Sequence, residues 1–482
     1  MMSSMKRAWL CLAALWAAAG CAHHGAAPGA PAEPSRPWTP PAAVAEASPP
    51  PAAPAVAPGR EYALPELIDV AMRTNPDTRI AWEGARAAAA RLDRAESDYL
   101  PILALNVQAG HSRIESRTSD GGVFTSGPSI TPQLLLAWRL LDFGRRDADW
   151  DARAQELLAA DFRFNRRHQD VAFSVERAYF RFDAARAEIV ATEATLAAAK
   201  QVREAADALS RQGLATRTDV AVSRQQEAQA RYEVEVARKL QADARAELAR
   251  AVGVSPAAPL DVTPMPESTA LPAALDASVD TLIAAALRDR PDLSELAATV
   301  RAREAETRRA EADFKPTVDA AGAVGGTAGT FRAENGTKGF DYAEPIWGAF
   351  VTFNWNFYDA GRRRARVLEA EALRRESEAE LAALRLQAEG DVWRSWADYQ
   401  AARTQVEFAK VLLEASQEAY DAVFAGYRAG LNSVTDLVQV ERDLARARST
   451  RIDSQARMLE AAASLTHAVG APAPARPVPP PG

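Results

Sequence analysis

The sequence predicts an α+β membrane protein in which long antiparallel helices continue into strands of a transmembrane β-barrel shared between several copies of the chain. Three observations indicate this fold class: two long segments lack proline, four short segments alternate apolar and polar residues, and one order of segments occurs twice. Of the 482 residues, 48% are hydrophobic but only 7% are aromatic, which favours thin helical packing over one large core. The net charge of −7 is spread over interspersed Arg and Glu, which argues against a nucleic-acid partner.

The N-terminus has the form of an export signal. Two basic residues precede the apolar segment 8–19, so residues 1–20 are predicted to be a signal peptide. Cys21 follows three small residues and resembles the acylated first residue of a bacterial lipoprotein. The alternative is conventional cleavage that leaves a free thiol, and in both cases the mature chain holds a single Cys and no internal disulfide. No later segment has 18 uncharged apolar residues, so no transmembrane helix is expected.

The prolines divide the chain. Of the 30 prolines, 11 lie in residues 28–58, 5 in 256–272 and 6 in 472–481. Proline costs about 3 kcal/mol inside a helix, so these ranges are predicted to be linkers or tails. The predicted organisation is a signal peptide (1–20), a lipidated Pro/Ala-rich linker (21–60), a first repeat (61–254), a second linker (255–276), a second repeat (277–471) and a Pro-rich tail (472–482).

The segments without proline predict long helices. Residues rich in Ala, Arg, Glu and Leu indicate helices from about Arg145 to Arg211 and from about Arg362 to Arg428, each roughly 100 Å long. Helices of about half that length are predicted at 65–99 and 218–252. Matching residues recur at offsets of 215 to 217, which indicates two copies of one unit. The matched pairs are Pro76 and Pro291, Asp142 and Asp359, Trp138 and Trp355, Gly213 and Gly430, and Gly253 and Gly470.

A short turn occurs once in each predicted repeat. Residues 211–220 read RQGLATRTDV and residues 428–437 read RAGLNSVTDL. Each stretch predicts that a helix ends at a left-handed glycine and that the next begins at a Ser/Thr-x-x-Asp cap, so each is an αα-hairpin. These positions are Gly213, Thr216 and Asp219 in the first turn and Gly430, Ser433 and Asp436 in the second.

Alternating segments predict four strands, at about 102–110, 131–142, 317–327 and 348–358. Segment 349–358 reads AFVTFNWNFY and places its apolar residues on one face. This pattern suits a lipid-facing barrel strand, and the alternative is a half-buried strand of a soluble sheet. Four strands are too few for a barrel and open edges are not tolerated in lipid, so the chain is predicted to form an oligomer, and a trimer would supply twelve strands. The predicted membrane-facing residues are Trp138, Val351, Phe353, Trp355 and Phe357.

The twin Gly-Leu-x-Ser/Thr-x-Thr-Asp turns, the Asp-x-Gly-Arg elements after the strands and the two-repeat layout resemble the TolC-type outer-membrane efflux protein family over about residues 62–471. The resemblance implies a homotrimer with a twelve-stranded outer-membrane barrel and a long antiparallel α-helical barrel that forms a periplasmic tunnel. It also implies two partners, a periplasmic membrane-fusion adaptor and an inner-membrane pump. Cys21 is similar to the lipidated branch that serves resistance-nodulation-division pumps, although the Pro/Ala-rich segment before the first helix departs from that branch.

The resemblance also implies roles for the turns, which form the periplasmic tips in that family. The residues expected to dock the adaptor are Gly213, Leu214, Thr216, Gly430, Leu431 and Ser433. The residues expected to line the tunnel gate are Asp219, Tyr427, Asp436 and Gln439. Asn432 stands where the best-known member has an Arg, so closure is expected to rely on hydrogen bonds and packing.

The sequence leaves other functions to consider. An enzyme is not favoured, because the five His show no metal-binding spacing and neither a phosphate loop nor a nucleophile elbow is present, so no cofactor is expected. Within the channel class, drug or metal efflux competes with type I protein secretion. A remoter alternative is an exported coiled-coil scaffold.

Overall fold

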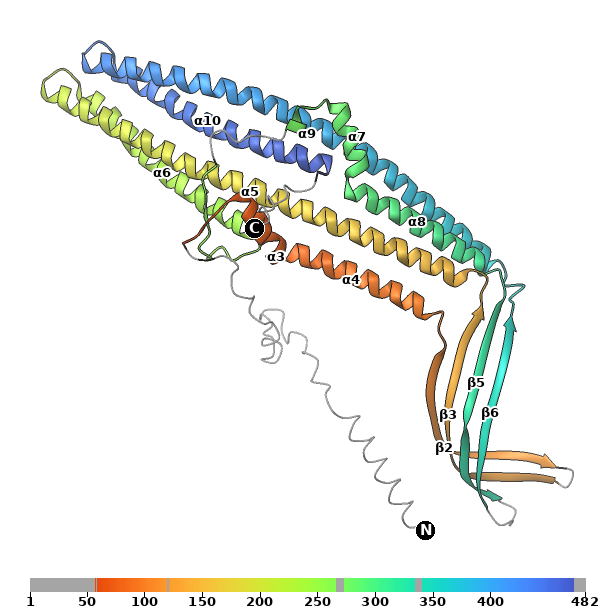
Figure 1. Cartoon of the computed structure of the whole chain (residues 1–482). Helices are drawn as coiled ribbons and strands as arrows, with labels where there is room; N and C mark the ends of the chain where they lie inside the picture. Colours follow the sequence, from red (N-terminus) through yellow and green to blue (C-terminus); the bar gives the residue numbers. More distant parts are fainter. Residues whose placement is uncertain (1–56, 58, 119–120, 266–272, 334–339, 472–482) are drawn as a thin grey trace, which may run out of the picture. The chain divides into compact units, whose positions relative to one another are not determined.

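The computed structural model describes residues 57, 59–118, 121–265, 273–333 and 340–471 (Figure 1). The chain divides into two units, Met1–Pro54 and Ala55–Gly482, and every described element belongs to the second. The predicted signal peptide and Cys21 lie outside the described residues.

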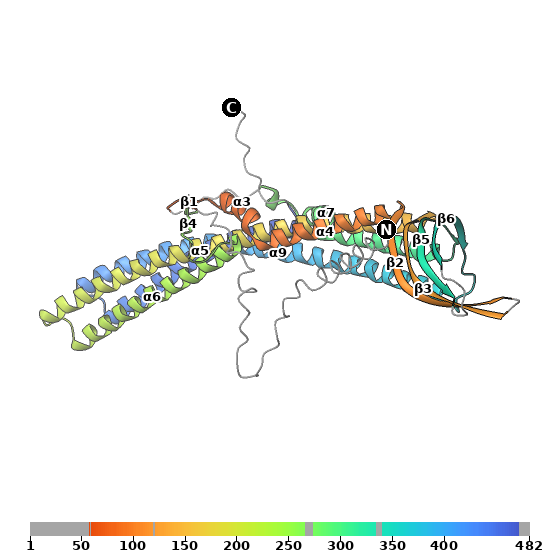
Figure 2. The same ribbon diagram turned by 90° about the horizontal axis from the view of Figure 1, so that it is seen from below.

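Two long helices dominate the second unit. Helix α5 spans Arg145–Arg211 and α9 spans Arg362–Arg428, which confirms the predicted bounds of both. Each is followed by a turn and a shorter helix that packs against it, α6 (Arg217–Val252) after α5 and α10 (Val434–Val469) after α9. Figure 2 shows the two hairpins running side by side toward their tips, and α5 also packs against α10.

The predicted helix at 65–99 is two helices, α3 (Leu64–Thr74) and α4 (Pro76–Ser97). Pro76 lacks an N–H group and disfavours the helical conformation in the residue before it, so Asn75 adopts the extended angles φ −69° and ψ 126°. The same break separates α7 (Val279–Asp289) from α8 (Pro291–Ala312).

Four antiparallel strands form one sheet in the order β2-β3-β5-β6. Each strand continues from, or leads into, one of the helices α4, α5, α8 and α9 (Figure 1). Strands β2 and β6 are the two edges of this sheet within the described chain. The strands are β2 (Ile102–Thr118), β3 (Gly121–Leu141), β5 (Thr317–Ala333) and β6 (Phe340–Asn354).

The strands differ from the predicted ones in length and position. Strands β2, β3 and β5 extend beyond their predicted bounds into Gly/Ser/Thr-rich sequence, because backbone pairing does not require an alternating side-chain pattern. Strand β6 begins earlier than predicted and ends at Asn354, so Trp355 and Phe357 lie beyond it, which corrects their assignment to a strand. The reason is that Asn354 pairs with Thr317, the first residue of β5, and the preceding Pro316 has no N–H to extend the ladder.

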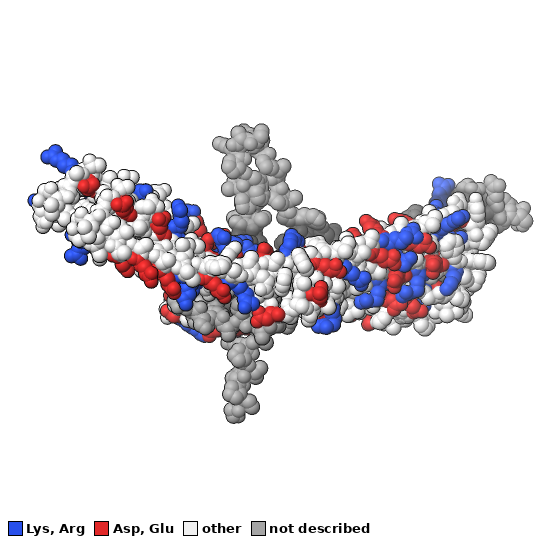
Figure 3. Space-filling model, turned by 90° about the horizontal axis from the view of Figure 1, so that it is seen from above, with Lys and Arg blue, Asp and Glu red and all other residues white. Residues whose placement is uncertain are grey.

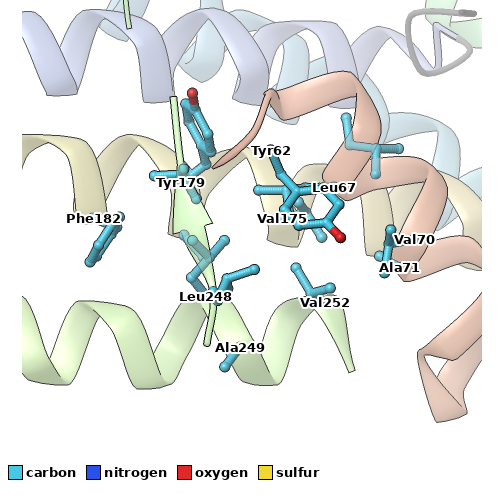
Figure 4. Packing of buried hydrophobic residues seen from close by; sticks show 14 of the residues in the cluster. Tyr62, Leu67, Val70, Ala71, Val175, Tyr179, Phe182, Leu248, Ala249 and Val252 are labelled. Atoms are coloured by element: carbon cyan, nitrogen blue, oxygen red, sulfur yellow. The ribbon is translucent and has the colours of Figure 1, made fainter. Parts of the chain in front are cut away.

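Buried apolar residues form separate clusters along the helices. One cluster joins α3, α5 and α6 around Leu67, Val175 and Leu248 (Figure 4). It also includes Tyr62 of β1 (Glu61–Tyr62), which pairs in parallel with β4 (Asp261–Val262). A second cluster fills the hairpin tips, and a third joins α7, α9 and α10 next to the short 3-10 helix η1 (Ala273–Asp276). Alanine is frequent in these clusters, so they are thin, as the low aromatic content predicted.

Candidate functional site

The first hairpin tip has the predicted turn geometry. Helix α5 ends at Arg211, and Gly213 adopts a left-handed φ of 75°. The Leu214 N–H then donates to the Leu209 carbonyl at 2.9 Å, a bond that closes the C-terminal turn of α5. Thr216 caps α6, since its N–H donates to the Asp219 carboxylate at 2.8 Å and its hydroxyl accepts from the Asp219 N–H at 3.2 Å.

The second tip repeats this geometry. Gly430 has φ 76°, and the Leu431 N–H donates to the Gly426 carbonyl at 2.9 Å. The Asp436 carboxylate accepts from the Ser433 hydroxyl at 2.7 Å and from the Ser433 N–H at 3.2 Å. The hydrogen bond donated by the Ser433 hydroxyl holds the pKa of Asp436 below its ordinary value. Asp436 is therefore a capping residue that remains anionic.

Both tips present a leucine to solvent. Leu214 is 74% exposed and Leu431 is 82% exposed, although the helices behind them bury an apolar cluster. Exposure of a large apolar side chain at a turn that contains a well-formed cap is not required by folding. The two leucines are therefore available for contact with a partner.

Among the predicted gate residues, Tyr427 and Asp219 lie close enough to interact although they belong to α9 and α6. Tyr427 is 4% exposed, and its hydroxyl has no hydrogen-bond partner in the described chain. Burial raises the pKa of Tyr427, and the negative charge of Asp219 raises it further. Gln439 is exposed and donates to Asp443 at 3.1 Å.

Asn432 occupies the position at which the resemblance implies an Arg. Its side chain packs against Gly426 in the last turn of α9. A Cβ carbon built on Gly426 would come within 1.8 Å of the Asn432 Oδ1 atom. Asn432 therefore packs against the backbone of its own turn.

The same local geometry joins strand to helix at two places in the chain, a feature that the sequence did not reveal. Asp142 is buried after β3 and accepts from the Arg146 N–H at 3.2 Å and from its Nε at 2.7 Å. The same guanidinium donates to the Arg139 carbonyl at 2.8 Å and to the Asp98 carbonyl at 3.3 Å. Arg146 thus ties the end of β3 to the start of α5 and to the end of α4.

The joint between β6 and α9 has the same construction. Asp359 accepts from the Arg363 N–H at 3.1 Å and from its Nε at 2.8 Å, and Arg363 donates to the Asp313 carbonyl at 3.4 Å. Phe143 and Ala360 both adopt φ 55°, which is costly for residues other than glycine. The Asp-x-Gly-Arg elements are therefore strained elbows, and a partly buried ion pair holds each of them.

The predicted membrane-facing side chains are exposed on the single chain. The exposed fractions are 41% for Trp138, 71% for Val351, 62% for Phe353, 56% for Trp355 and 84% for Phe357. Trp138 and Trp355 lie at the strand–helix joints, where their indole N–H groups donate to the carbonyls of Tyr99 and Phe314 at 2.9 and 3.2 Å.

Charges on the helices are balanced near the strands. Figure 3 shows positive and negative side chains interspersed at this end of the helices. Ion pairs link α5 to α8, among them Asp151 with Arg308 at 2.7 Å and Glu295 with Arg163 at 2.7 Å. Each pair has at least one side chain that is more than half exposed, so each adds little to stability.

Within the described segments, no helix is both long and apolar enough to pass through a membrane. The same residues contain no group of three His, Cys, Asp or Glu side chains that would hold a metal ion.

Residues 67–254 and 282–471 match the model of the outer membrane efflux protein family. The chain therefore belongs to this family, which confirms the resemblance found in the sequence. This is a family of outer-membrane efflux proteins and not of enzymes.

Individual proteins show the same likeness. The chain is 29% identical over 440 residues to Protein CyaE of Bordetella pertussis, covering 90% of both chains. It is 24% identical over 381 residues to Outer membrane protein OprJ of Pseudomonas aeruginosa, covering 79% of this chain and 78% of OprJ. The structure of the outer-membrane channel OprN matches with a TM-score of 0.74 and 22% identity, over 84% of this chain and 89% of OprN, and shows the fold.

Proposed function

We propose that the protein is the outer-membrane channel and periplasmic tunnel of a tripartite efflux system. In this proposal it passively conducts substrates that an inner-membrane pump and a periplasmic adaptor deliver. The observation that carries the proposal is the match of two long segments, 67–254 and 282–471, to the outer membrane efflux protein family. These two segments are proposed to be repeats of one unit.

The sheet supports an oligomeric barrel. Its edge strands β2 and β6 have unpaired backbone groups within the described part of one chain. Such groups are costly in lipid, so we propose that copies of the chain pair edge to edge until the sheet closes. Three copies of the four described strands would give a twelve-stranded barrel, in the size range of known outer-membrane barrels.

The helices support a tunnel. The long helices α5 and α9 leave the strands through the rigid elbows at Arg146 and Arg363, and end at the two tips. At 1.5 Å per residue a helix of 67 residues is roughly 100 Å long, which would carry the conduit far from the membrane. Because the sequence has no nucleotide-binding motif, the conduit must borrow its driving force from the pump.

The tips are proposed to dock the adaptor and to narrow the entrance. The exposed leucines Leu214 and Leu431 would supply apolar contacts, and the glycine turns would set their position. Asp436, which remains anionic, and Asp219 would favour cations at the entrance, and the proposed gate also includes Tyr427 and Gln439. Acylated Cys21 would anchor the N-terminus to the periplasmic leaflet and would assist a barrel that already holds the protein in the membrane.

Complementation tests the proposed function. A host that lacks the gene should become hypersensitive to drugs or metals, and the wild-type chain should restore resistance. Loss of one secreted protein without any change in sensitivity would replace efflux with type I protein secretion. Release of the protein from membranes by salt instead of detergent would contradict the barrel and favour the scaffold alternative.

Two measurements address assembly and anchoring. Native mass spectrometry of detergent-extracted protein should detect a trimer, and a folded, membrane-inserted monomer would contradict the shared barrel. Mass spectrometry of the N-terminal peptide should detect a diacylglyceryl adduct on Cys21. A mature chain that starts at another residue would exclude the lipid anchor.

A further inference from the structure

A carboxylate lies inside the apolar core of the hairpin tips. Glu441 of α10 is 1% exposed, and neither of its side-chain oxygens has a hydrogen-bond partner in the described chain. It occupies the same stripe of α10 as Leu437 and Leu444, which are 0% and 1% exposed. A single chain provides this burial, so it does not depend on neighbouring copies. An ionised carboxylate in such a place is costly unless it is paired.

The groups around Glu441 do not compensate its charge. Tyr420 approaches it from α9, and its hydroxyl is also buried without a partner. Helix α6 contributes Glu233, whose like charge opposes ionisation of Glu441, and the neighbouring Arg442 of α10 opposes that effect. Helix α5 adds apolar residues to the cluster, and its Arg203 is paired with Glu227 of α6.

Another buried carboxylate in the tips, that of Glu227, has its charge balanced by arginines. Glu227 of α6 is 5% exposed, and its two oxygens pair with Arg203 at 2.7 Å and with Arg231 at 2.6 Å. The position that matches Glu441 in the first hairpin is Arg224, whose side chain is 66% exposed. The uncompensated carboxylate is therefore a property of the second hairpin.

We propose that Glu441 makes the second hairpin acid-responsive: with its carboxyl protonated the tip stays packed, and with the carboxylate ionised α9 and α10 separate more readily at the tunnel entrance. The effect on conduction rests on the proposed channel function, whereas the effect on packing does not.

The direction of the response follows from the different proton affinities of Glu441 in the packed and the opened tip. Burial raises the pKa of Glu441 from 4.5 to about 7 in the packed tip. In an opened tip the Glu441 carboxyl is hydrated, and its pKa returns toward the ordinary value. The packed form therefore binds the proton more tightly, and low pH favours it. Between pH 4.5 and 7 each pH unit should raise the opening equilibrium by up to about tenfold, with no further rise above pH 7.

Hydrogen exchange of the full-length, detergent-extracted protein tests this response. Peptides that cover 434–444 should lose protection as the pH rises from 5 to 7, after correction for intrinsic exchange rates. Glu441→Gln, which removes the charge and keeps the shape, should abolish this loss of protection. Glu441→Leu, which matches the neighbouring leucines, provides a second neutral variant if the amide folds poorly.

The matched control is Glu227→Gln, which removes a buried carboxylate that has partners. It should weaken the first hairpin at every pH but leave the pH response of peptides 434–444 in place. A wild-type tip with no response over this range, or an unchanged response in the two neutral Glu441 variants, would overturn the proposal.

Channel recording separates this proposal from the proposed function. Conductance of wild-type protein in planar bilayers should fall on acidification from pH 7 to 5, and that of Glu441→Gln should not. Absence of conductance at every pH would refute the channel and leave the exchange result standing. A conductance that falls equally in both proteins would refute the role of Glu441 at the entrance.

Discussion

Gly253 and Asn75 lie so close together that a Cβ carbon on Gly253 would come within 2.6 Å of the Asn75 Cα atom. Gly253 caps the C-terminus of α6, and Asn75 separates α3 from α4. The Asn75 side-chain amide donates to the Ala251 carbonyl at 2.8 Å. The same contact occurs between Gly470 and Arg290, where a Cβ carbon would lie 2.9 Å from the Arg290 Cα atom. The backbone at each proline break thus packs against the C-terminal end of α6 or α10.

This contact predicts different costs for two glycines that share a backbone conformation. Gly253 has φ 82° and Gly213 has φ 75°, but a Cβ carbon on Gly213 would meet nothing within 4 Å. Both Gly→Ala substitutions incur backbone strain of about 1 kcal/mol, and Gly253→Ala adds overpacking of about 1–3 kcal/mol. The melting temperature of the helices, followed by circular dichroism, should therefore fall further for Gly253→Ala. Equal shifts would show that the helix end moves away from the break at no cost.

Arg146 predicts that the strand–helix elbow depends on a guanidinium and not on charge alone. Arg146→Lys keeps the charge but loses the fork that reaches Asp142 and the carbonyls, so it should destabilise the elbow by about 1–3 kcal/mol. Arg145→Lys is the control, because Arg145 makes one partly exposed ion pair with Asp313 at 3.3 Å. Protease cleavage near residue 142 should accelerate in the first variant only, and equal cleavage in both would refute the role of the elbow.

The orientation of β6 predicts unequal effects of a charge on adjacent residues. Phe353→Arg would place a charge on the proposed lipid face and should impair membrane insertion by about 2–4 kcal/mol if the residue lies at mid-membrane depth. Thr352→Arg is the control, because Thr352 pairs across the strands with Asp319 and points to the opposite face. Heat-resistant trimers on gels would report insertion, and equal loss for both variants would mean that the two faces are misassigned.

The turn at Gly430 predicts a loss of function without a loss of assembly. Its φ of 76° is unfavourable for a β-branched residue, so Gly430→Val should add about 1–3 kcal/mol of local strain and displace Leu431. Trimers should remain at normal abundance while drug resistance is lost. Gly390→Val, in the open interior of α9, controls for the added side chain and should retain resistance. Retained resistance in both variants would show that the turn does not position the docking leucine.

The sequence predicted those features that depend on local chemistry. The bounds of α5 and the caps at Thr216 and Ser433 follow from proline, glycine and Ser/Thr-x-x-Asp patterns that act within one turn of helix. The break at Asn75 was missed, although Pro76 stands well inside the predicted helix 65–99, where proline disfavours a continuous helix. Glu441 was missed for a different reason: a single carboxylate on an amphipathic helix resembles a solvated one until neighbouring helices enclose it.

The hydrogen bonds that hold the elbows could not be predicted from the sequence either. The Asp142–Arg146 spacing is visible in the sequence, but the carbonyl of Asp98 that completes the cluster comes from another helix. The end of β6 depends in the same way on Pro316, the residue before its partner strand. Long-range partners of this kind leave no periodic signal in the segment that they terminate.

Asp436 predicts that charge and capping at the second tip can be separated. Its carboxylate accepts from the Ser433 hydroxyl and N–H, and the hydroxyl bond lowers its pKa, so the charge persists at neutral and mildly acidic pH. Asp436→Ala removes this charge from the proposed entrance and should lower cation preference, measured as the reversal potential across a salt gradient in planar bilayers. Ser433→Ala is the control, because it removes the cap at a cost of about 1 kcal/mol but keeps the carboxylate. It should destabilise the tip and leave ion preference unchanged. If both variants keep the wild-type reversal potential, Asp436 is a capping residue only and the selective part of the channel lies elsewhere.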